Sequence, residues 1–172
     1  MDAAAHYRQL LTLQRDEFLA AAAPAMLVRY RARWVAAAPA AAPDNDLSET
    51  MDVGLSRGRL VEGATEMELY PLAKQAGTAF PDRITIGRTS NNDVVIPEHS
   101  VSRFHAYVRQ TPGWVVADAG SKNGTWIGDT VVLPRREAAL APGAVVRLGD
   151  VRLTFYRSSD LFDRHGGSHA GR

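Results

Sequence analysis

The chain contains no cysteine, no excess of charge of either sign and no long hydrophobic run, and each absence excludes a class of protein. Without cysteine it has no disulfide bond and no thiolate metal site, which favours a reducing compartment. Its 20 Lys and Arg residues against 19 Asp and Glu residues leave a formal charge of +1, so no strong overall field attracts nucleic acid or a membrane surface. The most apolar segment, Phe18 to Tyr30, is interrupted by Pro24 and Arg29 and falls short of the ~20 residues of a membrane span.

The length of 172 residues, with 45% hydrophobic and 8% aromatic residues, is typical of one globular domain with extensions. The first residues, MDAAAHYRQ, place an acid at position 2 and no basic cluster before an apolar run, so no secretory signal is predicted. We therefore expect a cytoplasmic protein. A high content of Ala and Arg is associated with bacterial sequences.

Residues 1–38 are rich in Ala, Leu and Arg and are predicted to be a helical extension. Helical spacing of long side chains from Ala3 to Ala23 predicts an amphipathic helix, which Pro24 ends or kinks. We expect the helix to pack on the rest of the chain or to pair with itself or a partner, rather than to be a mobile arm, because its apolar stripe is costly to leave in water. Residues 25–35 are ambiguous, although Met26 to Tyr30 is compatible with a short strand. The stripe comprises Tyr7, Leu10, Leu11, Gln14, Phe18 and Leu19.

The residue composition changes at two points after this extension. Residues 39–66 begin with a breaker-rich acidic run and are predicted to be a linker or a partly ordered extension. In residues 67–158, eight short apolar runs at a spacing of roughly 8–12 residues predict an antiparallel β-sandwich. Residues 159–172 are polar and are predicted to be a disordered tail. The predicted strands are Leu69–Ala73, Arg83–Gly87, Asp93–Ile96, His105–Arg109, Trp114–Asp118, Thr125–Ile127, Ala144–Leu148 and Val151–Tyr156.

Three loops between these predicted strands carry residues suited to holding a phosphate dianion. An arginine provides a charged fork, a serine provides a hydroxyl donor, and a Gly/Asn turn provides free backbone N–H groups. Each motif taken alone is also compatible with an ordinary surface turn. Asn-Gly, for example, is a strong hairpin signal in its own right. The motifs are Gly87-Arg88, Ser102-Arg103 and Lys122-Asn123-Gly124.

His105 lies three residues after Ser102 at the start of a predicted strand. We expect it to brace the loop by hydrogen bonds and so to fix the direction of the serine. The alternative is a nucleophilic Ser–His pair, which lacks a third group and a strand-to-helix nucleophile elbow.

Together these motifs resemble the forkhead-associated (FHA) domain, a phosphothreonine-peptide binding module. The resemblance covers about Met67 to Arg157 and rests on Gly-Arg, Ser-x-x-His and Asn-Gly in that order, with Leu140-Ala-Pro-Gly143 leading to Val146-Arg-Leu-Gly-Asp150. It implies an eleven-stranded β-sandwich whose loops at one end bind phosphothreonine. The resemblance further implies the following roles: phosphate contacts from Arg88 and Ser102, added charge from Arg103 and Lys122, a peptide-backbone contact from Asn123, and loop support from Gly87, His105 and Gly124.

The sequence offers no catalytic or metal centre in these loops. Its carboxylates at Asp93, Glu98, Asp118 and Asp129 are dispersed, and Walker-type glycine spacing is absent. His165 and His169 lie in the predicted tail, where weak adventitious metal binding is conceivable. We therefore expect a binding protein with no cofactor and no metal, rather than an enzyme.

The leading functional hypothesis is recruitment of phosphothreonine-containing partners downstream of a Ser/Thr kinase. A phosphate-independent scaffold or oligomerisation module, using the sandwich and the N-terminal helix, is the alternative, and a Ser102–His105 hydrolase ranks last. Thr50 lies in an acidic segment, Ser48-Glu-Thr-Met-Asp52, and is either an ordinary linker residue or, when phosphorylated, a ligand for this same site in cis or between chains.

Overall fold

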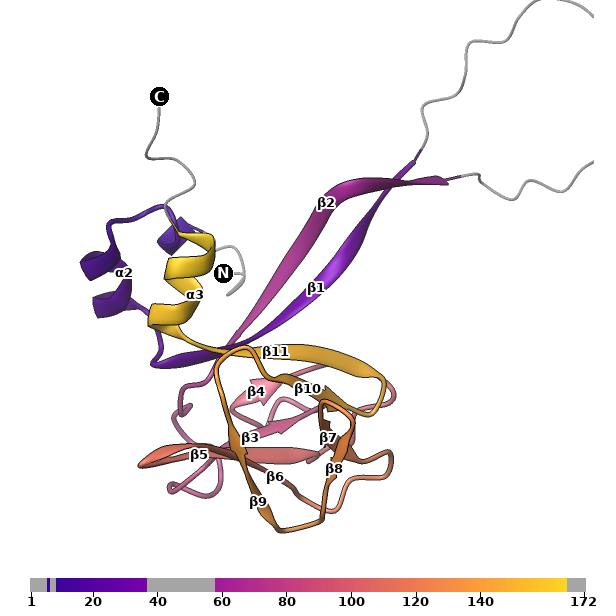
Figure 1. Cartoon of the computed structure of the whole chain (residues 1–172). Helices are drawn as coiled ribbons and strands as arrows, with labels where there is room; N and C mark the ends of the chain where they lie inside the picture. The colour runs from indigo at the N-terminus through magenta and orange to yellow at the C-terminus, as the bar shows by residue number, and fades with distance from the viewer. Residues whose placement is uncertain (1–5, 7–8, 37–57, 167–172) are drawn as a thin grey trace, which may run out of the picture. The chain divides into compact units, whose positions relative to one another are not determined.

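The structure, a computed structural model of the 172-residue chain, describes residues 6, 9–36 and 58–166. In these residues eleven strands form two sheets, one in the order β2-β1-β11-β10-β7-β8 and one in the order β4-β3-β5-β6-β9 (Figure 1). The predicted all-β sandwich is therefore confirmed. The strands are β1 (Ala25–Ala36), β2 (Gly58–Pro71), β3 (Ile84–Gly87), β4 (Val94–Val95), β5 (Ala106–Thr111), β6 (Gly113–Asp118), β7 (Thr125–Ile127), β8 (Thr130–Val132), β9 (Glu137–Leu140), β10 (Val145–Leu148) and β11 (Val151–Arg157).

The chain divides into two compact units. One spans residues 30–67 and contains the greater part of β1 and β2, which are neighbours in the sheet order. The other spans residues 1–29 and 68–172 and contains the rest of the sandwich together with helices that include α2 and α3, described below. The candidate binding residues of the sequence all belong to this second unit.

Alternation of apolar and polar residues builds the core between the sheets. In β11, Val151, Leu153 and Phe155 are buried while Arg152 is exposed. Burial on every second residue is the expected pattern for a strand with one face on the core. The Trp114 ring of β6 lies 5.8 Å from the Phe155 ring, and this contact joins the two sheets. The alternation of apolar and polar residues along the strands therefore determines which side chains form the core.

The register of β3, β5 and β6 brings the candidate loops to one end of the sandwich. β3 pairs antiparallel with β5 through Ile86 opposite Ala106, and β5 pairs antiparallel with β6 through Ala106 opposite Asp118. The end of β3, the start of β5 and the end of β6 therefore lie side by side. β3 also pairs parallel with β4, an exception to the predicted antiparallel arrangement.

Two strands of the sandwich were absent from the sequence prediction. β8 is a three-residue edge strand, and β9 consists of Glu, Ala, Ala and Leu, residue types that favour helices. β9 is a strand because it pairs along β6, with Leu140 opposite Trp114. Tertiary pairing thus overrides local propensity here.

The single helix predicted over Ala3 to Ala23 is wrong within the described residues. The backbone turns at residues 11–13, where the hydroxyl of Thr12 donates to the Gln9 carbonyl at 2.7 Å, and Gln14 is extended. Such local side-chain bonds compete with helix continuation. The helix that follows is α2 (Arg15–Ala21), and the ambiguous segment after it is strand β1.

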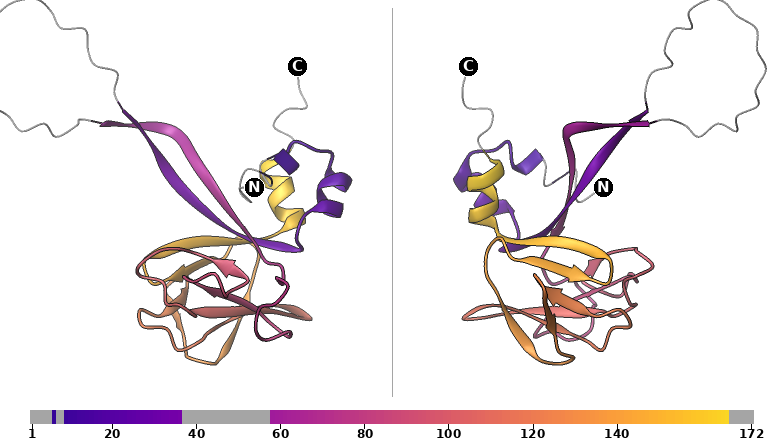
Figure 2. Two further views of the ribbon diagram at one scale, coloured as in Figure 1. Left: turned by 180° about the vertical axis from the view of Figure 1, so that it is seen from behind. Right: turned by 45° about the vertical axis from the view of Figure 1, so that its right-hand side comes forward.

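The expected packing of the N-terminal apolar residues on the chain itself is present. Leu10, Leu11 and Phe18 are buried. Phe18 packs against a C-terminal helix, because its ring lies 5.2 Å from that of Phe162. This helix is α3 (Ser158–His165), and Figure 2 shows it beside α2 in both views.

The predicted tail and linker are also corrected where the structure describes them. Residues 158–165 are helical rather than disordered, with Leu161 fully buried, and residues 58–66 belong to strand β2 rather than to a linker. The sequence signal for α3 was hidden by the neighbouring glycines and histidines. Residues 37–57, which include Thr50, and residues 167–172 lie outside the described residues.

Candidate functional site

The loops β3–β4, β4–β5 and β6–β7 line one open groove of about 930 Å³. All of the predicted phosphate-binding residues and the predicted peptide-binding residue line it. The sequence motifs, which are separated by up to 35 positions along the chain, therefore converge on one surface. The groove is lined by Arg88, Thr89, Asn91, His99, Ser100, Val101, Ser102, Arg103, Phe104, Gly120, Lys122 and Asn123.

Gly87 allows the β3–β4 loop to lie directly against the loop that carries Ser102. A Cβ atom at Gly87 would lie 2.2 Å from the Arg103 carbonyl oxygen and 2.7 Å from the Asn92 side-chain nitrogen. That carbonyl accepts hydrogen bonds from Asn92 Nδ2 at 2.7 Å and from Thr89 Oγ1 at 3.0 Å. Only glycine permits this close backbone approach.

Ser102 is held at three of its polar atoms by three different parts of the site. Its N–H donates to His105 Nδ1 at 3.0 Å, and its carbonyl accepts from the Arg88 N–H at 2.9 Å. Its hydroxyl oxygen accepts from the Lys122 N–H at 3.0 Å. Because Oγ is already an acceptor, the hydroxyl proton is available to donate into the groove.

His105 braces two loops through its two ring nitrogens. Nδ1 accepts from Ser102, so the ring proton lies on Nε2, which is 2.9 Å from the Gly124 carbonyl oxygen. The side chain is fully buried. Burial lowers the pKa of His105, and the hydrogen bond to Gly124 and the charge of Asp118 oppose that shift without cancelling it. The ring is therefore a neutral brace.

The β6–β7 turn is built around the buried carboxylate of Asp118. Oδ1 accepts from the Gly120 and Ser121 N–H groups at 2.7 and 2.9 Å, and Oδ2 accepts from the hydroxyls of Ser121 and Thr125 at 2.6 and 2.7 Å. Burial would raise the pKa of Asp118, but these hydrogen bonds outweigh it and the pKa is lowered. The turn ends at Gly124, whose φ of +81° suits glycine.

Asn123 connects this turn to the β4–β5 loop. Its Nδ2 donates to the Ser100 carbonyl at 2.8 Å. The hydroxyl of Ser100 accepts from the Asp150 N–H at 3.1 Å, so the β10–β11 turn supports the same residue. With one N–H of its amide used in this way, Asn123 retains a second N–H donor and Oδ1 as an acceptor.

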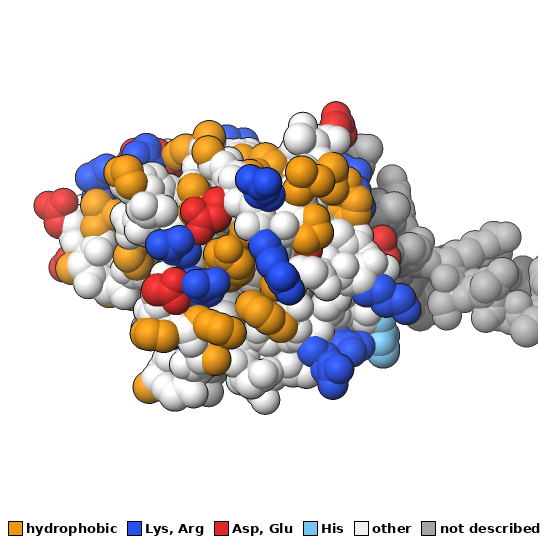
Figure 3. Space-filling view, turned by 90° about the horizontal axis from the view of Figure 1, so that it is seen from below, with side chains coloured by type: hydrophobic (Ala, Val, Ile, Leu, Met, Phe, Trp, Pro, Cys, Tyr) orange, Lys and Arg blue, Asp and Glu red, His pale blue; other side chains and the backbone are white. Residues whose placement is uncertain are grey.

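The groove carries uncompensated positive charge. Arg88, Arg103 and Lys122 line it, and no Asp or Glu side chain is among its lining residues. In the part of the chain that the structure describes, no side-chain hydrogen bond or ion pair engages these three cations. Figure 3 shows one face of the molecule, on which basic side chains and a histidine gather near one edge.

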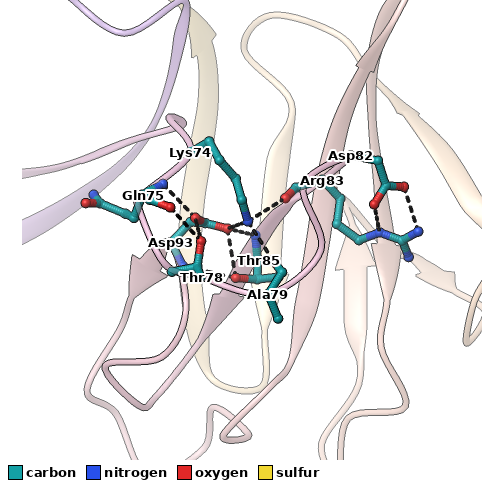
Figure 4. Close-up of polar contacts among 8 residues, drawn as sticks. All are labelled: Lys74, Gln75, Thr78, Ala79, Asp82, Arg83, Thr85 and Asp93. Carbon is teal, nitrogen blue, oxygen red and sulfur yellow. Dashed lines mark hydrogen bonds and ion pairs between the residues drawn. The ribbon is translucent and has the colours of Figure 1, made fainter.

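Asp93 is a supporting residue that the sequence analysis did not identify. Its fully buried carboxylate accepts from Lys74 Nζ at 2.9 Å, from the Gln75 and Thr85 N–H groups at 2.7 Å each, and from the hydroxyls of Thr78 and Thr85 at 2.5 and 2.9 Å (Figure 4). Burial opposes the charged form, yet the donors outweigh it and lower the pKa of Asp93. The network fixes the end of the β3–β4 loop that carries Arg88.

The sequence analysis also did not predict that Asn92 and Asp118 support the loops of the site through hydrogen bonds. The Asp-x-Gly-Ser run after β6 was a usable signal, because Asp commonly caps a following turn with its side chain. Asn92 gave no such signal, since its partner, the Arg103 carbonyl, lies eleven residues away in the sequence.

The described ranges contain no group of three or more His, Asp or Glu side chains placed to hold a metal ion. None of the helices in those ranges has the length and apolar character that crossing a bilayer requires.

The part of the sequence that contains these loops matches a known protein family. The FHA domain family matches residues 84–149. The ABC transporter ATP-binding/permease protein Rv1747 of Mycobacterium tuberculosis is 37% identical over 90 residues, which are 52% of this chain and 10% of that protein. The oxoglutarate dehydrogenase inhibitor of Corynebacterium diphtheriae is 38% identical over 72 residues, 41% of this chain and 48% of that protein.

A solved structure, described as one of phosphothreonine-dependent FHA domain interactions, covers 77% of this chain and 95% of its own, with 21% identity and a TM-score of 0.42. The two sheets and the groove formed by three loops at one end define the class as a β-sandwich. More specifically, residues 84–149 are an FHA domain. The chain spans about a tenth of the first curated relative and about half of the second.

Proposed function

We propose that this protein recruits phosphothreonine-containing partners downstream of a Ser/Thr kinase in the cytoplasm, through the groove between its three loops. One observation carries this proposal. Within the described residues, three cationic side chains without a side-chain partner line the same groove as a serine hydroxyl whose proton is available to donate. A threonine phosphate near pH 7 carries a charge of about −1.5 to −2 and three strong acceptor oxygens. The groove supplies donors and charge for such a group.

Arg88 and Ser102 hold the phosphate in this proposal. Their backbones are joined by the 2.9 Å bond from the Arg88 N–H to the Ser102 carbonyl, so the two side chains start from fixed neighbouring positions. Arginine matches phosphate with a planar fork, and the serine adds a hydroxyl donor. Arg103 and Lys122, both exposed, add positive charge.

Asn123 contacts the peptide backbone in the proposed complex. One N–H of its side-chain amide already donates to the Ser100 carbonyl, at 2.8 Å. The remaining Oδ1 suits a backbone N–H of an extended peptide. Because Asn123 also ties two loops together, its loss is expected to weaken both the contact and the loop geometry.

The arrangement of Ser102 and His105 argues against a hydrolase. His105 accepts a hydrogen bond from the backbone N–H of Ser102 rather than from its hydroxyl, and its other nitrogen faces Gly124. A general base must reach the proton that it removes. Both ring nitrogens are already engaged, and the proposed function is binding rather than catalysis.

The deciding experiment measures binding of a phosphothreonine peptide library and its unphosphorylated copies to wild type, Arg88→Ala and Ser102→Ala. We expect binding that depends on phosphate and that falls by roughly 30-fold or more in Arg88→Ala, because charge-assisted bonds to a dianion are among the stronger ones. Arg152→Ala, an exposed arginine of β11, is the matched control and should bind as wild type does.

Equal binding of phosphorylated and unphosphorylated peptides would contradict the proposal and favour the phosphate-independent scaffold. Turnover of an activated ester that disappears in Ser102→Ala would instead restore the hydrolase. A phosphoserine copy of the best peptide tests the expected preference for threonine.

We further propose that phosphorylated Thr50 is one ligand of this groove, in cis or between chains. The residues around Thr50 include Asp44, Asp46, Glu49 and Asp52, and no Lys or Arg lies between positions 37 and 56. A ligand with this charge complements a groove that holds three cations and no carboxylate. Self-association through the N-terminal residues is the alternative route to oligomers.

A synthetic peptide of residues 44–56 separates charge from recognition. We expect tight binding when Thr50 is phosphorylated and at least tenfold weaker binding when Ser48 is phosphorylated, since the two peptides carry equal charge. Equal affinities of the two peptides would exclude Thr50 as a specific ligand. In the full chain, Thr50→Ala should abolish any association that depends on kinase treatment.

A further inference from the structure

The turn that leads into Ser102 forms one wall of the groove and is held by its own backbone. The Glu98 N–H donates to the Ile96 carbonyl at 2.8 Å, and the Val101 N–H donates to the Glu98 carbonyl at 3.0 Å. His99 and Ser100 lie between these two bonds and line the groove. The orientation of Glu98 therefore sets the direction in which the turn enters the site.

The Glu98 side chain is bound by a residue far away in the sequence. Arg29 of β1 donates from Nη1 to Glu98 Oε1 at 2.6 Å. The two side chains are 19% and 34% exposed, so water screens this pair less than a fully exposed one. Burial tends to lower the pKa of Arg29, but the hydrogen bond and charge of Glu98 outweigh it and the pKa is raised.

Arg29 also approaches a second carboxylate with the same nitrogen atom. Its Nη1 lies 3.7 Å from Glu68 Oε2 on β2, and Glu68 accepts from the Tyr70 hydroxyl at 3.0 Å. Burial and Glu68 raise the pKa of Tyr70 to about 12, so this phenol keeps its proton and stays a donor at neutral pH. Immediately before Arg29 in the sequence, Ala25 to Val28 of β1 pair with β11. The Arg29 side chain thus links the paired strand β1 to Glu98 in the turn.

We propose that Arg29 is a positioning residue for the phosphate-binding turn, and that strand β1 is thereby energetically coupled to the affinity for phosphopeptide. Arg29 does not line the groove, and its contact with the turn is the ion pair with Glu98. The coupling concerns the start of β1, up to Arg29, which belongs to the same compact unit as Glu98. It rests on the function proposed above.

A double-mutant cycle tests the coupling. Affinity for the best phosphothreonine peptide of the library is measured for wild type, Arg29→Gln, Glu98→Gln and the double variant. We expect each single variant to lose about 3- to 10-fold in affinity. The double variant should lose no more affinity than Glu98→Gln, because Arg29→Gln removes no further contact to the turn once Glu98 is changed. Unchanged affinity in Arg29→Gln, or losses that multiply in the double variant, would overturn the proposal.

A second ion pair of similar length and exposure serves as the control. Arg109 Nη1 lies 2.7 Å from Glu137 Oε1, with side chains 35% and 33% exposed, on strands β5 and β9. Arg109→Gln should leave the affinity within about twofold of wild type. An equal loss in this variant would mean that any surface ion pair affects binding, which contradicts a specific role for Arg29.

Amide hydrogen exchange without ligand distinguishes failure of the coupling from failure of the proposed function. In Arg29→Gln we expect faster exchange at Val101, whose N–H bonds to Glu98, and unchanged exchange at Val116 in β6. If wild type bound no phosphopeptide but Val101 still responded, the proposed function would fail while the positioning role stood. If Val101 did not respond, the positioning role would fail whatever the protein binds.

Discussion

The backbone N–H of Ser102 donates to Nδ1 of His105 at 3.0 Å, and this single bond fixes the charge state of the imidazole. A ring nitrogen that accepts carries no proton, so His105 is neutral in the folded protein. The other ring nitrogen lies 2.9 Å from the Gly124 carbonyl oxygen and joins a second loop to the first. The site thus depends on one buried, uncharged histidine.

We predict that acidification destabilises the folded protein through His105. Burial lowers its pKa in the folded state, whereas an unfolded histidine titrates near 6.5. The unfolded chain therefore binds more protons as the pH falls below about 6.5, and the free energy of unfolding decreases from there down to the folded pKa. Nuclear magnetic resonance titration of the imidazole should give a midpoint below that of free histidine.

The control for this pH effect is His165, whose pKa is lowered by burial and by Arg164. Its contribution has the same sign, so urea unfolding at pH 7.5 and 5.5 should be compared in wild type and His165→Gln. A pH dependence that vanished in His165→Gln would show that His105 does not contribute.

Gly87→Ala is predicted to cost roughly 1–3 kcal/mol of stability and to weaken phosphopeptide binding. The new Cβ would lie 2.2 Å from the Arg103 carbonyl oxygen, so the backbone beside Ser102 must move. Urea unfolding and peptide titration measure the two effects. Gly113→Ala, where a Cβ meets nothing within 4 Å, should change stability by less than about 0.5 kcal/mol. Equal behaviour of the two variants would refute the steric argument.

Asp93→Asn is predicted to destabilise the fold by about 2–4 kcal/mol. The five donors that converge on the carboxylate suit an acceptor with two oxygens, and an amide places an NH₂ group against some of them. Since the pKa of Asp93 is lowered, its stabilising effect in wild type should disappear as the pH falls below about 4. Asp129→Asn, on an exposed residue, should match wild type.

Leu161→Ala is predicted to cost about 2–4 kcal/mol, as expected for a fully buried leucine. The result distinguishes a packed helix α3 from a disordered end of the chain, where the substitution would have no effect. Asp163→Ala in the same helix removes an exposed ion pair to Arg15 and should cost less than about 1 kcal/mol. Chemical denaturation of both variants provides the comparison.

The sandwich could be predicted from the sequence wherever a strand has one buried and one exposed face. β5, β10 and β11 show this alternation and were predicted nearly to their ends. β9 could not be predicted, because Glu137 to Leu140 favour a helix locally and become a strand by pairing with β6. α3 was missed because short helices depend on packing, here between Leu161, Phe162 and Phe18.

The groove residues could be predicted because spaced motifs specify them, whereas their supports could not. The order of Gly87-Arg88, Ser102 and Asn123 indicated one site, and the structure brings these residues together. Asn92 and Asp93 act through carbonyl and amide groups that only the folded chain places nearby. The bracing role expected for His105 agrees with its two hydrogen bonds.

The hydrogen bonds that join the three loops have a kinetic consequence. The bonds from Asn92 to Arg103, from Lys122 to Ser102 and from Asn123 to Ser100 are made within the protein itself. A surface assembled in advance docks nearly as a rigid body, so encounters need no slow rearrangement. For the phosphopeptides that the groove is proposed to bind, we expect similar association rates, so that differences in affinity lie mainly in the dissociation rates.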